Sequence, residues 1–145
     1  MKTRVLILCT HNSSRSQMAE GLLRALAGEQ FEVFSAGSQP SSVHPLAVQA
    51  MLLRGIDIRQ HTAKHLQMFL GQPFDYVITV CDDAAETCPF FPGRAERIHW
   101  SFPDPSAMQG TDDERLAVFV QVREGLEARF STWIAQMPDP MTERA

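Results

Sequence analysis

The chain has 145 residues, of which 44% are hydrophobic and 21% are charged, so we expect one globular domain with a sizeable core. Its 17 acidic residues outnumber its 13 basic residues, and the net charge of −4 argues against a general nucleic-acid binder. No apolar run approaches the ~20 residues that cross a bilayer, and no signal peptide precedes the first predicted strand. We therefore expect a cytoplasmic protein that contacts neither membrane nor nucleic acid.

Strand-like and helix-like stretches alternate along the chain. The unbroken apolar run at 5–8 is typical of a strand that is covered on both faces in a parallel sheet. Further strands are predicted at 31–34, 76–80 and 97–100. Helices are predicted from about Ser16 to Gly28, from Pro45 to about Arg54, from an N-cap at Thr62 to Leu70, and from a capping box at Thr111.

This alternation predicts an α/β fold of three layers with a central four-stranded parallel sheet. Residues 1–137 are expected to form one domain. Residues 138–145 follow the end of the last predicted helix, so we expect them to be a flexible tail.

The eight residues between the first predicted strand and the first predicted helix include a cysteine, an arginine and several small polar residues. They read Cys9-Thr10-His11-Asn12-Ser13-Ser14-Arg15-Ser16. In a strand–loop–helix turn, backbone N–H groups converge on an anion and the helix dipole adds roughly half a positive charge. Arg15 can bind two oxygens of that anion, while the Cys9 thiolate would lie beneath its central atom as nucleophile. We therefore predict that residues 10–16 bind a tetrahedral oxyanion and that Cys9 attacks it.

Several of these residues also have a structural interpretation. Cys9 could be a buried structural thiol, although a strand-to-helix loop is not a core position. Asn12 could brace the loop, because its side chain bonds nearby backbone and tolerates positive φ. Ser16 could cap the helix or donate a hydrogen bond to the Cys9 thiolate, and the sequence leaves both alternatives open.

Two further candidates follow other predicted strands. Cys81 comes directly after the third strand, and Asp104 lies a few residues after the fourth. Ligands of parallel sheets bind outside the carboxyl ends of the strands, so Cys9, Cys81 and Asp104 are expected at one edge. Asp104 stands between two prolines and could only shape a turn, or it could be the general acid that protonates a departing oxygen.

The chain has three cysteines, an odd number for a disulfide framework. The spacing of Cys81 and Cys88 does not suit a zinc site, and the histidines form no catalytic or ligand pattern, so no metal or other cofactor is expected. The thiols could be coincidental. They could also form a disulfide relay, in which Cys81 reaches Cys9 and Cys88 reaches Cys81 if the segment between them bends.

The stretch from Cys9 to Gly21 resembles the start of the thioredoxin-coupled arsenate reductases, which share the fold of the low-molecular-weight protein tyrosine phosphatases. Further matches are Ser35-Ala36-Gly37, Val80-Cys81, Cys88-Pro89, and His99-Trp100 with Phe102 and Asp104-Pro105. The three-cysteine set is more specific than the anion loop, since the phosphatases share the loop but lack the relay pair that Cys81 and Cys88 would form.

The resemblance implies a reaction sequence. Arsenate, which phosphate or sulfate can mimic, would bind in the loop and be attacked by Cys9, with Asp104 protonating the departing oxygen. Cys81 would then attack Cys9 and release arsenite, and Cys88 would attack Cys81. Thioredoxin would reduce the final disulfide, with glutathione and glutaredoxin as the alternative reductant, and the protein is expected to be a monomer.

The sequence also departs from the family pattern. His11 stands where many members have glycine, and we expect it to preserve the loop by adopting positive φ. The family's potassium site resembles Asn12, Glu20 and Ser35, but its acidic fourth ligand falls at Lys64. We therefore hypothesise that the Lys64 ammonium replaces the potassium ion.

Two rival functions remain. One is a phosphotyrosine or phosphomonoester phosphatase that uses Cys9, Arg15 and Asp104, although the acidic Asp-Pro pair of the phosphatases lies much nearer the C-terminus. The other is a non-enzymatic oxyanion-binding or redox-sensing module, which would need neither turnover nor Asp104.

Overall fold

The computed structural model describes residues 2–82 and 84–137, and the predicted tail at 138–145 lies outside this part. The elements in chain order are β1 (Thr3–Cys9), α1 (Arg15–Ala27), β2 (Phe31–Gly37), α2 (Pro45–Leu53), the 3₁₀ helix η1 (Leu66–Phe69), β3 (Tyr76–Thr79), β4 (Glu96–His99), the 3₁₀ helix η2 (Pro105–Ala107) and α3 (Asp112–Gln136). No helix within these residues has the length and hydropathy to span a membrane.

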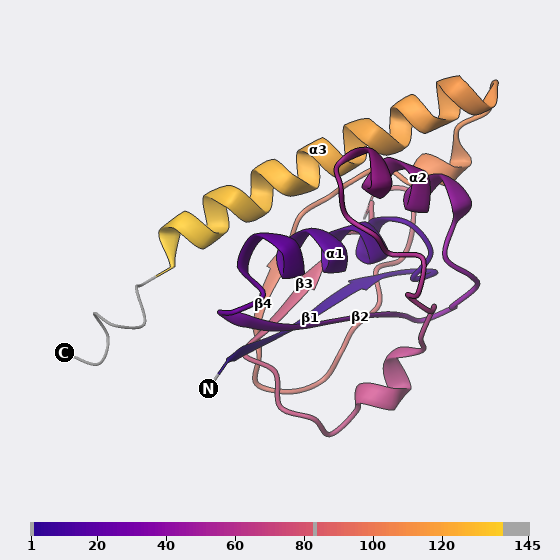
Figure 1. Ribbon diagram of the computed structural model, residues 1–145. Coiled ribbons are helices and arrows are strands. Elements are labelled where there is room, and N and C mark those ends of the chain that lie inside the picture. Colours follow the sequence, from indigo (N-terminus) through magenta and orange to yellow (C-terminus); the bar gives the residue numbers. More distant parts are fainter. Residues whose placement is uncertain (1, 83, 138–145) are drawn as a thin grey trace.

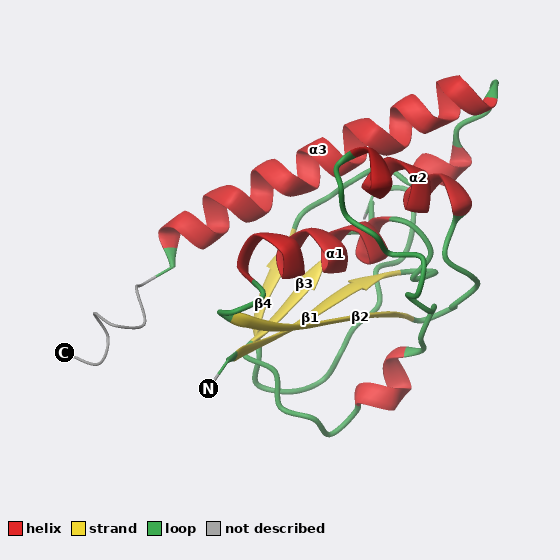
Figure 2. Cartoon of the chain, in the orientation of Figure 1, coloured by secondary structure: helices red, strands yellow, loops and turns green. Residues whose placement is uncertain are grey.

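The described strands form one four-stranded parallel sheet in the order β2-β1-β3-β4 (Figures 1 and 2), which confirms the predicted fold class. β1 and β3 are neighbours, with Leu8 opposite Thr79. Their carboxyl ends therefore deliver Cys9 and Cys81 to the same edge, as predicted.

The sheet is covered on both faces. Helices α1, α2 and α3 pack on one face, where Val5 and Ile7 of β1 lie in the larger core cluster (Figure 2). Leu6 and Leu8 point to the other face, where η1 and the loop after it supply Phe69 and Phe74. Successive residues of a strand point to opposite faces, so a strand covered on both sides must be apolar at every position.

Helix α3 begins at the predicted capping box. The Thr111 hydroxyl accepts a hydrogen bond from the Glu114 N–H at 3.1 Å, and the Glu114 carboxylate accepts from the Thr111 N–H at 3.2 Å. The inward face of α3 places Phe119, Val122, Leu126 and Phe130 in the core. Leu116, Val120, Ile134 and Met137 are only partly buried at the margin of this core.

The helix predicted from Thr62 to Leu70 is wrong. Only η1 forms there, and its N-terminus is capped by His65, whose Nδ1 accepts a hydrogen bond from the Gln67 N–H at 3.0 Å. The preceding chain is held extended, because the Lys64 N–H donates to the Asn12 side chain at 2.9 Å and the Lys64 carbonyl accepts from the Gly37 N–H at 2.9 Å. These tertiary hydrogen bonds replace the ones that a helix would have made.

Candidate active site

The anion loop, residues 9–16, runs from the last residue of β1 into the first turn of α1. Among the described non-glycine residues only Asn12 has positive φ, at 47°, so the expectation that His11 adopts this conformation is wrong. Asn tolerates the left-handed region better than most residues. β2 closes tightly on the loop, since a Cβ on Gly37 would lie 2.5 Å from the Thr10 carbonyl oxygen and 2.9 Å from the Asn12 nitrogen.

Asn12 is fully buried and its side-chain amide is saturated with hydrogen bonds. Its Oδ1 accepts from the Lys64 N–H and from Gln17 Nε2, both at 2.9 Å. Its Nδ2 donates to Ser16 Oγ at 2.7 Å and to Ser35 Oγ at 3.0 Å. An amide has two donor hydrogens and one acceptor oxygen, so this network uses all of them and holds the loop in one conformation.

The same network orients a hydrogen bond at the candidate nucleophile. Ser16 Oγ lies 2.8 Å from Cys9 Sγ in a buried environment. Because Asn12 already donates to Ser16 Oγ, the Ser16 hydroxyl hydrogen is free to point at the sulfur. Of the two alternatives for Ser16, the structure supports the donor, since Ser14 occupies the N-cap position of α1.

Cys9 lies in a pocket of about 250 Å³ that is also lined by Ser13, Ser14, Arg15 and Asp104. Ser14 is buried, and its Oγ has no hydrogen-bond partner among the described residues. Such a hydroxyl is costly to bury unless a ligand satisfies it. The pocket therefore combines a thiol, a guanidinium and an unsatisfied hydroxyl, a set of groups suited to an oxyanion.

Asp104 reaches this pocket from the loop after β4. Its Oδ1 accepts hydrogen bonds from the Ser106 N–H at 2.9 Å and from the Ser106 hydroxyl at 2.7 Å, so it also caps η2. The turn-shaping role and a position in the pocket are thus compatible. The structure brings Cys9, Arg15 and Asp104 together as the sequence predicted.

His44 also lines the pocket, a position that the sequence did not indicate. It caps α2, because its Nδ1 accepts from the Leu46 N–H at 3.1 Å. Burial lowers the pKa of His44, as does the positive charge of Arg115, while the Asp104 charge opposes them. Since Nδ1 is an acceptor, the neutral ring carries its proton on Nε2.

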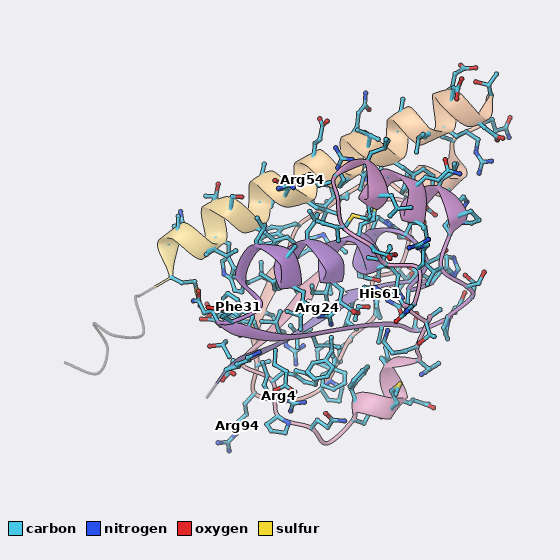
Figure 3. The ribbon with its side chains drawn as sticks, in the orientation of Figure 1. Arg4, Arg24, Phe31, Arg54, His61 and Arg94 are labelled. Carbon is cyan, nitrogen blue, oxygen red and sulfur yellow. A yellow bond between two sulfur atoms is a disulfide. The ribbon has the colours of Figure 1, made fainter. Side chains whose placement is uncertain are left out.

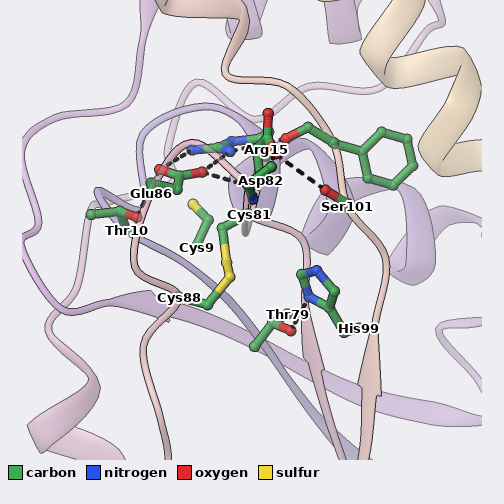
Figure 4. Close-up of a disulfide and its surroundings, with 12 residues drawn as sticks. Cys9, Thr10, Arg15, Thr79, Cys81, Asp82, Glu86, Cys88, His99 and Ser101 are labelled. Carbon is green, nitrogen blue, oxygen red and sulfur yellow. Dashed lines mark hydrogen bonds and ion pairs between the residues drawn. A yellow bond between two sulfur atoms is a disulfide. The ribbon is translucent and has the colours of Figure 1, made fainter.

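Cys81 and Cys88 form a disulfide with 5.9 Å between their Cα atoms (Figure 4). The chain between them turns sharply, because the N–H groups of Ala85 and Glu86 both donate to the Asp82 carbonyl, at 3.1 and 2.9 Å. This is the bend that a relay requires. Cys9 remains a free thiol, and Figure 4 shows it beside the disulfide.

A ring nitrogen of His99 lies within 4.8 Å of both disulfide sulfurs, and His99 Nδ1 is 2.6 Å from Thr79 Oγ1. Two thiols and an imidazole could in principle hold a soft metal ion. In this structure the two sulfurs are bonded to each other, which removes them as metal ligands.

Glu86 is the main site residue that the sequence analysis missed. Its carboxylate forms an ion pair with Arg15, with Arg15 Nη2 3.2 Å from Oε2, and accepts hydrogen bonds from the Thr10 hydroxyl at 2.9 Å and the Asp82 N–H at 2.7 Å (Figure 4). Burial alone would raise the pKa of Glu86, but these bonds and the Arg15 charge lower it to about 2. The only sequence signal was that Glu86 is one of three acidic residues in the short spacer between Cys81 and Cys88.

Arg15 is almost completely buried, and the Phe102 carbonyl also accepts from its Nη1 at 3.1 Å. Burial would lower the pKa of Arg15, but the hydrogen bond to Glu86 and the charges of Cys9, Glu86 and Asp104 raise it above its usual value. Arg15 therefore stays charged, and in this structure the carboxylate of Glu86, from the segment between Cys81 and Cys88, balances that charge.

Behind the loop, the buried Glu20 carboxylate accepts a hydrogen bond from Ser35 at 2.6 Å. Arg24 Nη1 lies 2.9 Å and Lys64 Nζ 3.8 Å from its oxygens. His61 Nδ1 lies 3.6 Å away, and burial lowers the pKa of this ring; Arg24 and His61 are labelled in Figure 3. Burial lowers the pKa of Lys64, and Arg24 adds to this effect while Glu20 opposes it. Cationic side chains thus neutralise Glu20 here.

The chain is similar to known proteins over most of its length. The family model of the low molecular weight phosphotyrosine protein phosphatases matches residues 4–141. An arsenate reductase of Halalkalibacterium halodurans is 44% identical over 132 residues, covering 91% of this chain and 95% of its own length, and one of Bacillus subtilis is 42% identical over 125 residues, covering 86% and 90%.

Solved structures give the same grouping. An arsenate reductase in the phosphate binding state superposes with a TM-score of 0.79 at 33% identity, covering 95% of this chain and all of that one. A thioredoxin-dependent arsenate reductase of Corynebacterium glutamicum has a TM-score of 0.68 at 32% identity, covering 92% of this chain and 61% of that one. The chain therefore belongs to the low-molecular-weight phosphotyrosine protein phosphatase family and, within it, groups with the bacterial arsenate reductases.

Proposed function

We propose that this protein reduces arsenate to arsenite and that Cys9, Cys81 and Cys88 carry the oxidation away from the substrate. The observation that supports this most directly is a Cys81–Cys88 disulfide beside a free, buried Cys9 in an anion loop. A phosphatase needs the loop and its thiol but has no use for the additional pair, Cys81 and Cys88.

The reaction begins with arsenate held by the loop amides, Ser14 and Arg15. The Cys9 thiolate, which accepts the Ser16 hydrogen bond, attacks arsenic and forms an S–As bond, and Asp104 protonates the departing oxygen so that it leaves as water. Thiolate attack at this stage changes no oxidation state.

The redox step follows when the Cys81 thiolate attacks Cys9 Sγ. The S–As bond breaks, its electron pair stays with arsenic, and arsenite leaves while a Cys9–Cys81 disulfide forms. Cys88 then attacks Cys81, which frees the Cys9 thiolate and yields the Cys81–Cys88 disulfide of this structure.

We propose that thioredoxin supplies the two electrons that reopen the disulfide, with glutathione and glutaredoxin as the alternative. The Corynebacterium glutamicum structure is of a thioredoxin-dependent arsenate reductase, which supports this choice. A dithiol reductant operates in a reducing compartment, so we place the reaction in the cytoplasm, and we expect a monomer to be sufficient.

A single-turnover experiment tests the relay. Fully reduced protein is mixed with arsenate in the absence of reductant, arsenite is counted, and disulfides are mapped by mass spectrometry. We expect one arsenite per chain and a Cys81–Cys88 disulfide in the wild type. Cys88→Ser should stop at a Cys9–Cys81 disulfide after one arsenite, whereas Cys81→Ser should release none. Unchanged free thiols together with rapid phosphate ester hydrolysis would instead identify a phosphatase.

We also propose that the Lys64 ammonium takes the place of a potassium ion behind the loop. The cationic side chains of Arg24 and Lys64, at 2.9 and 3.8 Å from the Glu20 carboxylate, support this proposal, because another cation would meet a carboxylate that is already neutralised. Exchanging sodium for potassium should leave both activity and melting temperature unchanged in the wild type, while Lys64→Asp should make both depend on potassium. A several-fold potassium activation of the wild type would refute the proposal.

A further inference from the structure

The Arg15–Glu86 pair joins the two halves of the site. Arg15 belongs to the anion loop, whereas Glu86 belongs to the segment that the Cys81–Cys88 disulfide closes. Arg15 is the loop's cation for binding an oxyanion, and it is almost completely buried. A buried guanidinium that holds a carboxylate has less positive charge to offer to a second anion.

We propose that Glu86 is a positioning residue that competes with the oxyanion for Arg15 when the Cys81–Cys88 disulfide is closed, so that the oxidised protein is held in a state of low oxyanion affinity. This inference rests on the proposed function, because it assigns the closed disulfide to the end of the reaction cycle.

The contacts of the carboxylate favour competition. Both Glu86 oxygens are engaged with the guanidinium, so the carboxylate occupies one two-nitrogen face of Arg15 as an oxyanion would. Glu86 also accepts a hydrogen bond from the hydroxyl of Thr10, the loop residue next to the nucleophile Cys9. An incoming dianion would therefore be repelled by the Glu86 carboxylate, which already occupies Arg15 and Thr10.

The disulfide controls where this carboxylate lies. Cys81 and Cys88 are seven positions apart, and their disulfide closes a ring that contains the turn in which the Glu86 N–H donates to the Asp82 carbonyl at 2.9 Å. The Asp82 N–H in turn donates to Glu86 Oε1 at 2.7 Å, so the turn that the disulfide closes also aims the side chain at Arg15. Reduction by two electrons and two protons opens the ring and removes this constraint.

This competition would lower oxyanion affinity after arsenite release and restore it on reduction. Arsenite leaves before the Cys81–Cys88 disulfide forms, and Glu86 then supplies the counter-charge that the buried Arg15 has lost. Phosphate, an abundant anion of the same shape as arsenate, is disfavoured in this state. The protein regains oxyanion affinity only after its thiols, which the next turnover needs, have been restored.

The test measures inorganic phosphate affinity by calorimetry on the disulfide form and on the fully reduced form, with Cys9 a free thiol in both. The wild type should bind phosphate about tenfold or more tightly when reduced, the effect expected of one charge-assisted contact. Glu86→Gln should abolish this difference by tightening binding to the disulfide form. Asp82→Asn is the matched control, since it removes a charge from the same segment without touching Arg15, and it should keep the difference.

Two results would overturn the proposal. Equal affinities of the two wild-type forms would show that Glu86 does not compete. Weaker phosphate binding by Glu86→Gln in both forms would show that Glu86 instead orients Arg15 for the anion. The single-turnover mapping of disulfides remains independent of both results, so failure of this inference is distinguishable from failure of the relay. Phosphate-induced shifts in melting temperature provide a second readout that needs only folded protein.

Discussion

In the anion loop, Asn12, Ser14, Arg15 and Ser16 are all buried, and Asn12 alone makes four side-chain hydrogen bonds. Between Cys81 and Cys88, the described residues are exposed or half-buried, and an ion pair and a disulfide hold them in place. The two regions are neighbours at one edge of the sheet.

The difference matches the chemistry that each region is proposed to perform. An oxyanion site works best when its donors are preorganised, so that no reorganisation is needed during the reaction. A thiol relay has to bring one sulfur to two partners in succession, which a rigid segment could not do. Burial supplies the preorganisation of the anion loop, and exposure of the 81–88 segment allows the movement that a relay needs.

The largest expected effect comes from removing the nucleophile on the rigid side. Cys9→Ser should lower the rate of arsenate reduction by ~10³-fold or more, because no other group can form the first bond to arsenic. Phosphate affinity of the reduced protein should change little, since serine keeps the size of the side chain. Arsenite release and phosphate calorimetry measure the two quantities, and residual turnover above about one per cent would place the nucleophile elsewhere.

A smaller loss of activity is expected when the anion loop keeps its positive charge but loses the two-nitrogen guanidinium group of Arg15. Arg15→Lys should lower kcat/KM for arsenate by ~10²-fold, because an ammonium cannot make two parallel hydrogen bonds to an oxyanion. Arg24→Lys is the control, since Arg24 is half exposed and its ion pair is with Glu20. Equal losses in both variants would mean that the geometry of Arg15 is not what matters.

The rigidity of the loop can be tested with a pair of variants at one position. Asn12→Gly removes the side-chain hydrogen bonds but tolerates φ 47°, and it should destabilise the protein by ~1–3 kcal/mol. Asn12→Ala loses the same bonds and adds left-handed strain, so it should be less stable than Asn12→Gly by a further ~1 kcal/mol. Urea unfolding measures both values, and a more stable Asn12→Ala would contradict the strain argument.

The segment between Cys81 and Cys88 has the smallest expected effect, which depends on pH. The pKa of Glu86 is lowered from 4.5 to about 2 in the folded disulfide form, so its contribution to stability is fully present above about pH 4.5 and is lost as the pH falls toward 2. Wild-type protein with its disulfide closed should therefore melt above Glu86→Gln at pH 7, and the gap should shrink between pH 4.5 and pH 2.

Reduction of the disulfide provides the control for this prediction. If the closed ring holds Glu86 on Arg15, opening it should reduce the melting gap between wild type and Glu86→Gln at pH 7. A gap that is the same in both redox forms would mean that the segment is as fixed as the loop and would remove the contrast between the two regions.

Much of this protein was determined by the sequence alone. Apolar runs at regular spacing, the capping box at Thr111 and the small polar residues after β1 are local signals with local causes, and they predicted the fold class and the position of the anion loop. The edge rule for parallel sheets then predicted that Cys9, Cys81 and Asp104 converge, because it needs only the order of strands and helices.

Only the tertiary structure decided what depends on contacts between distant segments. The extended chain before η1, which replaced a predicted helix, is held by Asn12 and Gly37 from other elements. Positive φ fell on Asn12 and not on His11 because Asn12 is the residue whose amide reaches Ser16, Ser35, Gln17 and Lys64 at once. Glu86 was missed because nothing in the sequence distinguishes it from the other acidic residues of the spacer, and its partner Arg15 is 71 positions away.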